Sequence, residues 1–146
     1  MHTDTPITVR YGETDMMGVV YHANYLLYFE DARIDFLRAL DFSYAEQIEG
    51  AGFMSPIHAV EIQYKSPLHY GEEGFVRTTI AKNLPMRTVY HHRVYRAGMN
   101  PETEPPLVDA HVTVCVVERD TFKPVNLKRT FPELYARYAE VVETQG

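Results

Sequence analysis

Residues 23–40 (ANYLLYFEDARIDFLRAL) are the segment that most constrains the fold of this chain. The segment contains no Gly or Pro and predicts a single helix, roughly 27 Å long at 1.5 Å per residue. On a helical wheel most of its apolar side chains share one arc of roughly 140°, but Leu27 and Ile34 lie outside that arc. Asp31 and Asp35 mark its most polar side. A helix that is apolar on more than one side predicts a surrounding layer that wraps around it.

Strand-favouring residues dominate most of the remaining chain. Segments rich in Val, Ile, Thr, Tyr and Phe, separated by Pro and Gly, predict strands at 5–11, 57–64, 75–81, 88–95 and 107–118. Short connections between the later strands favour antiparallel pairing, and the absence of alternating strands and helices disfavours a doubly wound fold. The last segment would be about 40 Å long if fully extended, which indicates a curved sheet. We therefore expect an α+β fold in one domain spanning residues 1–146, with five curved antiparallel strands wrapped around the long helix.

Two shorter helices are also expected. The first covers residues 43–49, with Ser43 as N-cap and Glu46 at the capping-box position. The second begins at Thr130 as N-cap, with a Pro in its first turn, and continues to about Val142.

Arg33 falls inside the apolar arc of the long helix. A charge in that position needs a partner, and Glu30, one turn earlier, is the expected one. Two interpretations follow from this pair. Either it is a buried structural ion pair, or Glu30 lies near a ligand and Arg33 positions it.

The loop at residues 11–25 (YGETDMMGVVYHANY) contains the greatest concentration of reactive side chains. Asp15 precedes a helix N-terminus, where unpaired backbone N–H groups and the helix dipole can polarise a carbonyl oxygen. Asp15 could then attack the carbonyl carbon or activate a water molecule. His22 could orient water or transfer a proton, and Tyr11 could hydrogen-bond the carboxylate or a substrate oxygen. The alternative is structural, because Asp is common in turns before helices.

The run YGETDMMGVVYHANYLLYFEDAR resembles the signature of the 4-hydroxybenzoyl-CoA thioesterase family, in particular its bacterial short acyl-CoA thioesterase branch. The segment IQYKSPL at 62–68 resembles a second block of that family, a strand that ends in Tyr-x-x-Pro. The residues that fill the first motif are Asp15, Gly18, Val19, Val20, Tyr21, His22, Asn24, Tyr25, Glu30 and Arg33.

The resemblance implies a hotdog fold and hydrolysis of an acyl- or aroyl-CoA thioester, with Asp15 as nucleophile or general base. It implies that the backbone N–H of His22 holds the thioester oxygen and that Tyr11 and the His22 side chain assist. Glu30 would lie near the acyl group, and in this family that position often approaches the acyl group from the other subunit. Hotdog subunits pair so that their sheets continue into one another, so we expect a homodimer or homotetramer. Motif residues expected to contact substrate are Gly18, Val19, Tyr21 and Asn24.

Charge is distributed unevenly along the chain. The formal net charge of −6 argues against nucleic-acid binding. The whole imbalance lies in residues 1–60, whereas residues 61–146 are neutral overall and contain basic runs at 62–100 and 119–137. These runs suit the phosphates of coenzyme A, which is part of the substrate, so no separate cofactor is expected. The bases predicted to contact it are Lys65, Arg87 and Lys128.

Several other classes of site are disfavoured. His91 and His92 are adjacent on a predicted strand and point to opposite faces, and no His-x-His or HExxH spacing exists, so no metal site is expected. Cys115 lies among valines, which favours a buried apolar role. No G-x-S-x-G motif, targeting segment or membrane span is visible, so a cytoplasmic protein is expected. The alternatives to a thioesterase are a non-catalytic acyl-CoA-binding hotdog module and, less favoured, a dehydratase.

Overall fold

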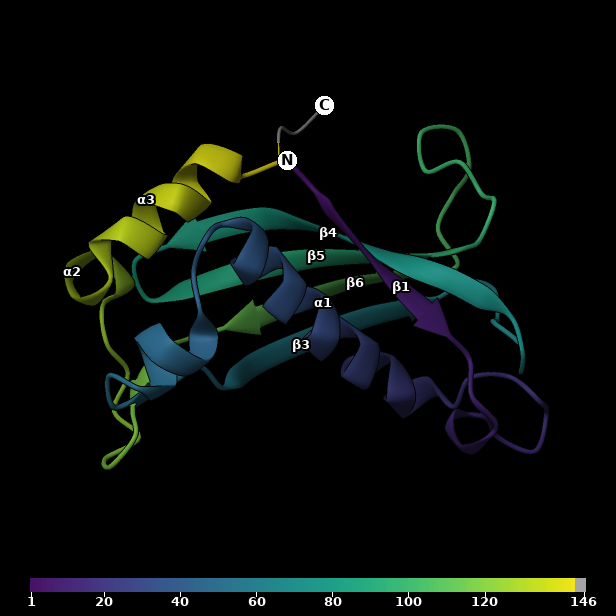
Figure 1. The fold of residues 1–146 in the computed structure, drawn as a ribbon, viewed down its shortest axis with the longest axis horizontal. Helices are drawn as coiled ribbons and strands as arrows, with labels where there is room; N and C mark the ends of the chain where they lie inside the picture. Colours follow the sequence, from purple (N-terminus) through teal and green to yellow (C-terminus); the bar gives the residue numbers. More distant parts are fainter. Residues whose placement is uncertain (144–146) are drawn as a thin grey trace.

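The computed structural model describes residues 1–143, and five strands of this part form one antiparallel sheet in the order β1-β4-β5-β6-β3 (Figure 1). The predicted antiparallel pairing is confirmed for every neighbouring pair in that sheet. The strands are β1 (Thr3–Thr8), β3 (Ile57–Tyr64), β4 (Glu73–Leu84), β5 (Arg87–Arg96) and β6 (Val108–Val114).

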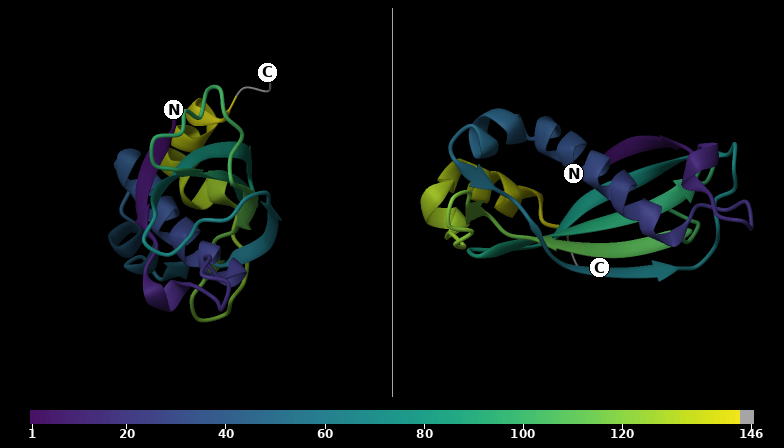
Figure 2. Two further views of the ribbon diagram at one scale, coloured as in Figure 1. Left: turned by 90° about the vertical axis from the view of Figure 1, so that its right-hand side faces the viewer. Right: turned by 90° about the horizontal axis from the view of Figure 1, so that it is seen from below.

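The long helix α1 (Tyr25–Ala39) lies across one face of this sheet, and the sheet curves around it (Figure 2). Its inward side chains, such as Ala32 and Phe36, are fully buried. Alternate residues of β4, β5 and β6 are buried as well, because successive strand residues point to opposite faces. The predicted α+β architecture, a curved sheet around a long central helix, is confirmed and is the arrangement called the hotdog fold.

The predicted bounds of the long segments need correction. Strand β1 covers Thr3–Thr8 rather than 5–11, since the chain turns into a short 3₁₀ helix at Tyr11–Glu13. The segment 107–118 is not one strand. Strand β6 ends at Val114, and β7 (Val117–Glu118) pairs instead with β2 (Phe53–Met54) in a second, two-stranded sheet. The longest strand is β4, which accommodates its length through a bulge between Ile80 and Lys82.

The two short helices are only partly as predicted. Ser43 does cap its helix, which is a π-helix at Tyr44–Glu49, by accepting a hydrogen bond from the N–H of Glu46 at 3.3 Å. The Ser43 N–H donates the reciprocal bond to Oε1 of Gln47 at 2.8 Å, one residue later than predicted, in keeping with the wider turn of a π-helix. Thr130 is not an N-cap. It is the last residue of α2 (Leu127–Thr130), and α3 (Pro132–Val141) begins two residues later.

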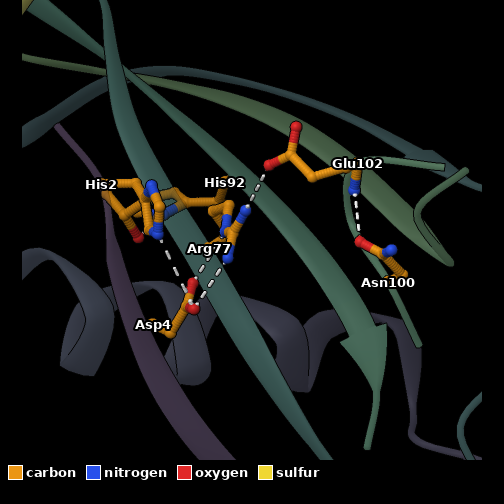
Figure 3. Close-up of polar contacts among 7 residues, drawn as sticks. His2, Asp4, Arg77, His92, Asn100 and Glu102 are labelled. Atoms are coloured by element: carbon orange, nitrogen blue, oxygen red, sulfur yellow. Dashed lines mark hydrogen bonds and ion pairs between the residues drawn. The ribbon is translucent and has the colours of Figure 1, made fainter. Parts of the chain in front are cut away.

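Strand β1 and the residues that follow α3 in the described part of the chain both lie beside β4. Arg77 of β4 fixes β1 by donating hydrogen bonds to the two carboxylate oxygens of Asp4 at 2.9 and 3.0 Å, and it also contacts Glu102 at 3.4 Å (Figure 3). Thr5 of β1 donates a 2.8 Å hydrogen bond to Asp35 of α1. Strand β1, which leads into the loop that contains Asp15, is thus held from both sides in its first half. None of the helices in the described part of the chain is long and apolar enough to span a membrane.

Candidate active site

The loop between β1 and α1 is a tightly bonded turn rather than an open connection. The N–H of Asp15 donates to the carbonyl of Val19 at 2.9 Å, and the N–H of Gly18 donates back to the carbonyl of Asp15 at 3.0 Å. Gly18 has φ +75°, a backbone conformation that residues other than glycine rarely adopt. The N–H of Val20 donates to the carbonyl of Leu68 at 2.9 Å. These bonds dock the turn on the segment that follows β3.

The carboxylate of Asp15 is half-buried and oriented by its own turn. Its Oδ1 accepts a hydrogen bond from the N–H of Met17 at 2.8 Å. Its Oδ2 has no hydrogen-bond partner among residues 1–143. One oxygen is therefore fixed, and the other remains for chemistry.

The start of α1 presents free backbone donors. A single 3₁₀ turn at His22–Asn24 precedes the helix, so α1 begins two residues later than expected. The N–H of Asn24 donates to the carbonyl of Tyr21 at 2.8 Å, but the N–H groups of His22 and Ala23 have no acceptor in the part of the chain that the structure describes. Two adjacent free N–H groups at a helix N-terminus can stabilise a developing oxyanion.

A cavity of about 290 Å³ joins these two features. It brings together four of the residues predicted for the site, namely Asp15, Val19, His22 and Lys65. The carboxylate, the helix start and a cation therefore face one space. The other residues that line it are Met17, Val20, Tyr25, Tyr64, Ser66 and Pro67.

Four further predicted residues belong to the loop before α1 and its 3₁₀ turns but do not line this cavity. Gly18 forms the turn, and the Asn24 side chain donates a 2.8 Å hydrogen bond to the carbonyl of Glu13. The ring of Tyr21 lies 4.4 Å from that of His22. Tyr11 is 78% exposed and its ring packs edge-on against Tyr70.

The remaining predicted residues lie farther away. Glu30 lines a second cavity along α1. Arg87, at the start of β5, lines a small cavity beside the C-terminal helices, and Lys128 of α2 lies 5.9 Å from the ring centroid of Tyr135. These helices lie at the end of the molecule opposite the Asp15 loop (Figure 1). Of the three predicted phosphate-binding bases, only Lys65 adjoins Asp15 within one chain.

Two residues that build the site were missed. Glu13 accepts a hydrogen bond from the hydroxyl of Tyr28 at 3.0 Å, and its carbonyl accepts the N–H of Tyr21 at 2.9 Å. Burial and this bond to Glu13 raise the pKa of Tyr28, which keeps its hydroxyl protonated. Tyr64 donates to the carbonyl of His22 at 2.9 Å. The Tyr-x-x-Pro motif contained a signal for Tyr64, whereas nothing in the sequence distinguished Glu13 from a surface acid.

The predicted ion pair between Glu30 and Arg33 is wrong. Glu30 is exposed, and the guanidinium of Arg33 has no hydrogen bond or ion pair within residues 1–143. Its Nε and Nη1 atoms are nevertheless buried. Glu30 stays exposed because moving its carboxylate out of water and into the apolar surroundings of Arg33 would cost hydration free energy.

Strand register assembles a histidine cluster that adjacency in the sequence did not reveal. His91 pairs with His111 across β5 and β6, and together with Asp109 they place ligand atoms within 4.8 Å of one another. His91 already bonds through Nε2 to Asp109 at 2.7 Å and through Nδ1 to Glu143 at 3.0 Å. Both ring nitrogens of His91 are therefore already engaged by carboxylates, and the His111 ring stacks on that of His91 at 4.3 Å.

A half-buried carboxylate and a helix start that share one cavity, on a long helix wrapped by a curved sheet, are the arrangement of the hotdog thioesterase class. The chain belongs to the thioesterase-like superfamily, whose family model matches residues 9–136.

Individual relatives agree with this family. The chain is 39% identical to the Bacillus subtilis protein YneP, provisionally named an acyl-CoA thioesterase, over 90% of this chain and 91% of that protein. It is 30% identical to the acyl-CoA thioesterase YbgC of Haemophilus influenzae, over 82% and 84% of the two chains. Its structure matches a DHNA-CoA thioesterase from Staphylococcus aureus with a TM-score of 0.86 and 35% identity, covering 95% of this chain and 89% of that one.

Proposed function

We propose that the protein hydrolyses acyl-CoA thioesters in the cavity that Asp15 shares with the start of α1. The observation that carries the proposal is one cavity lined by both the half-buried Asp15 and His22, the residue where the helix begins and where two successive backbone N–H groups lack an acceptor in the described chain. The names of the relatives support the same reaction.

The thioester oxygen accepts hydrogen bonds from the N–H groups of His22 and Ala23, which stabilise the negative charge that develops on it. Asp15 then acts in one of two ways. Its Oδ2 adds to the carbonyl carbon, the C–S bond breaks, and water hydrolyses the resulting anhydride. Alternatively, Oδ2 takes a proton from a water molecule that attacks the same carbon. In both routes coenzyme A leaves as a thiolate and is protonated.

Two nearby side chains suit the rest of the substrate. His22 is exposed at the mouth of the cavity, where its ring can exchange protons with the leaving thiol or with water. Lys65 lines the same cavity and is exposed, as expected for a cation that meets a phosphate of coenzyme A.

We propose further that the active form is a homodimer built along β3. This strand is an edge of the sheet, and its side chains are exposed on both faces with the exception of Ile62. Val60, Ile57 and Tyr64 are 42–50% exposed, and Leu26 and Leu27 of α1 are 42% and 54% exposed. An apolar edge of this kind attracts a second strand. A second copy that pairs along β3 would continue the sheet and cover both cavities of α1.

The names of the relatives also suggest which substrates to test. The Staphylococcus aureus structure is named a thioesterase for DHNA-CoA, an aromatic acyl-CoA, so aroyl-CoA substrates belong in the test beside straight-chain ones. The competing hypothesis, a non-catalytic acyl-CoA-binding module, predicts binding without thiol release.

The test is release of free thiol from a panel of straight-chain and aromatic acyl-CoA esters. The wild type should turn over at least one of them, and Asp15→Asn should reduce kcat by about 10²–10⁴-fold. Asp31→Asn, an exposed carboxylate on the polar side of α1, is the matched control and should behave as wild type. Tight binding of acyl-CoA without thiol release would favour the binding module. Equal activity of Asp15→Asn and wild type would exclude the proposed role of Asp15.

A further inference from the structure

A second cavity, of about 450 Å³, extends along α1 beyond the Asp15 cavity. The helix contributes Leu26, Glu30 and Arg33, which follow His22 at intervals of three or four residues and therefore share one face of the helix. Val60 and Val112 of the sheet form part of the opposite wall. The two cavities thus follow one helix face, with the thioester-binding N–H groups at one end and Arg33 toward the other.

The guanidinium of Arg33 is the anomaly of this cavity. It remains charged in any folded protein, yet its Nε and Nη1 atoms are buried without a partner in residues 1–143. Leaving a buried charge uncompensated is strongly unfavourable. Arg33 is half-buried and lines both this cavity and the small one beside the C-terminal helices, and its two buried nitrogens lack an acceptor within the described chain.

His92 adds a second polar group to the same wall. It is 1% exposed, its ring stacks on that of Phe29 at 4.8 Å, and its Nδ1 lies 2.9 Å from the hydroxyl oxygen of Thr78. Its Nε2 has no hydrogen-bond partner among the described residues. Burial, followed by the charge of Arg33, lowers the pKa of His92 to about 3. The ring is therefore neutral at physiological pH and provides no negative charge to balance Arg33.

We propose that Arg33, assisted by His92, is a specificity determinant that binds an acceptor oxygen at the far end of the acyl group, preferably a carboxylate. The inference rests on the proposed thioesterase function and names its substrate class: acyl-CoA esters whose acyl group carries such an oxygen. Apart from Tyr44, Ser55 and the exposed carboxylate of Glu30, the other residues that line the cavity are apolar, which suits the carbon skeleton between the two ends.

The geometry also limits the length of the acyl group. His22 and Arg33 are eleven residues apart, roughly 16 Å along the helix axis. An acetyl group cannot bridge that distance, whereas a longer dicarboxylic chain or a fused aromatic ring bearing hydroxyl groups can approach it.

The test compares matched pairs of substrates. The first series pairs succinyl-, adipoyl-, suberoyl- and sebacoyl-CoA with the neutral butyryl-, hexanoyl-, octanoyl- and decanoyl-CoA, and a hydroxynaphthoyl-CoA is paired with naphthoyl-CoA. For the wild type we expect kcat/KM to favour the oxygen-bearing member of at least one pair by about tenfold or more. No preference in any pair would overturn the proposal without any variant being made.

The variants then assign that preference to a residue. Arg33→Met should abolish it while activity on the neutral member persists, and Arg33→Lys should keep part of it. Arg38→Met, which removes an exposed arginine from the same helix, is the matched control and should keep the full preference. If Arg33→Met lowers both members equally, or dissociates a dimer without changing the ratio, Arg33 serves the fold or the subunit contact and the proposal is wrong.

The proposal remains testable if the proposed function fails. Should no ester release thiol, the affinities of non-hydrolysable thioether analogues of the same pairs can be compared by calorimetry. A preference for the carboxylate analogue that Arg33→Met removes would support the role of Arg33 in a binding protein. Equal affinities for the two analogues would overturn it.

Discussion

The hydroxyl of Tyr64 donates a 2.9 Å hydrogen bond to the backbone carbonyl of His22. Because a peptide group is planar and trans, a bond that fixes this carbonyl also fixes the N–H of Ala23 on the opposite side of the same plane. Tyr64 stands at the end of β3, so the edge strand of the sheet sets the direction of one of the two N–H groups assigned to the thioester oxygen.

Removal of this hydroxyl should therefore affect the chemical step more than binding. We expect Tyr64→Phe to lower kcat about tenfold with little change in KM, because the N–H of Ala23 loses its orientation for the transition state. Tyr70→Phe is the control, as Tyr70 is exposed and lies outside the Asp15 cavity. A rise in KM with unchanged kcat would assign Tyr64 to substrate binding instead of positioning.

The turn of Asp15 should be sensitive to backbone conformation alone. At Gly18 an added Cβ meets no atom within 4 Å, but φ is +75°. We expect Gly18→Ala to reduce the free energy of unfolding in urea by about 1 kcal/mol and to lower kcat as well, since the strained turn is the one that presents Asp15. Gly12→Ala also meets no atom within 4 Å and has no positive φ, so it should match wild type. Equal effects of the two substitutions would show that strain at Gly18 is not the cause.

The exposed edge of β3 should control assembly. Val60→Asp places a charge in the apolar strip at the edge of the sheet, and we expect it to convert the dimer to monomer in sedimentation velocity and to reduce activity at the same time. Gln63→Asp changes an exposed residue of the same strand and should leave the dimer largely intact. A wild type that sediments as a monomer at assay concentration would refute assembly along β3.

Glu72 should contribute to stability in a pH-dependent way. Its carboxylate accepts a 2.7 Å hydrogen bond from the N–H of His69, and this bond is the largest cause of a lowered pKa of Glu72. Partial burial opposes the shift, whereas hydrogen bonds from the His69 ring and Arg96 add to it. A carboxylate whose pKa falls on folding stabilises the protein above the unfolded-state pKa. That stabilisation is lost as the pH falls through the folded-state pKa.

The corresponding measurement is the Tm of wild type and Glu72→Gln across pH. Their difference should be constant near neutral pH and should shrink as the pH falls below about 4. Glu73→Gln, at an exposed neighbouring site, provides the comparison. A Tm difference that persists unchanged in acid would rule out the charge of Glu72 as its source.

The sequence predicted the architecture well because its strongest patterns are physical requirements of the fold. The helix at 23–40 needed apolar neighbours on several sides, and only a wrapping layer could supply them. The strand at 107–118 was extended too far because Cys115 and Val116 continue its apolar run although the chain changes sheets there. Apolar composition indicates burial but not which strand is the partner.

Prediction of the candidate site likewise succeeded for residues that are close in sequence and failed for residues whose position depends on the topology. Asp15, Val19 and His22 are close in sequence, so the loop before α1 brings them together. The prediction that Arg87 and Lys128 bind phosphate rests on charge alone. Their distance from Asp15 depends on the topology, which composition does not encode. The clustering of His91 with His111 likewise depends on strand register, which the sequence pattern did not specify.

The division of α1 between two cavities has an evolutionary consequence. Its first turn holds the groups assigned to bond cleavage, and the positions proposed to face the acyl group lie one to three turns later. Replacements at Leu26, Glu30 or Arg33 can therefore change which acyl group is accepted without disturbing the bonds that orient Asp15. Related chains with this fold can therefore differ in substrate specificity while catalysing the same reaction. Selectivity can be engineered by substitutions on a single helix.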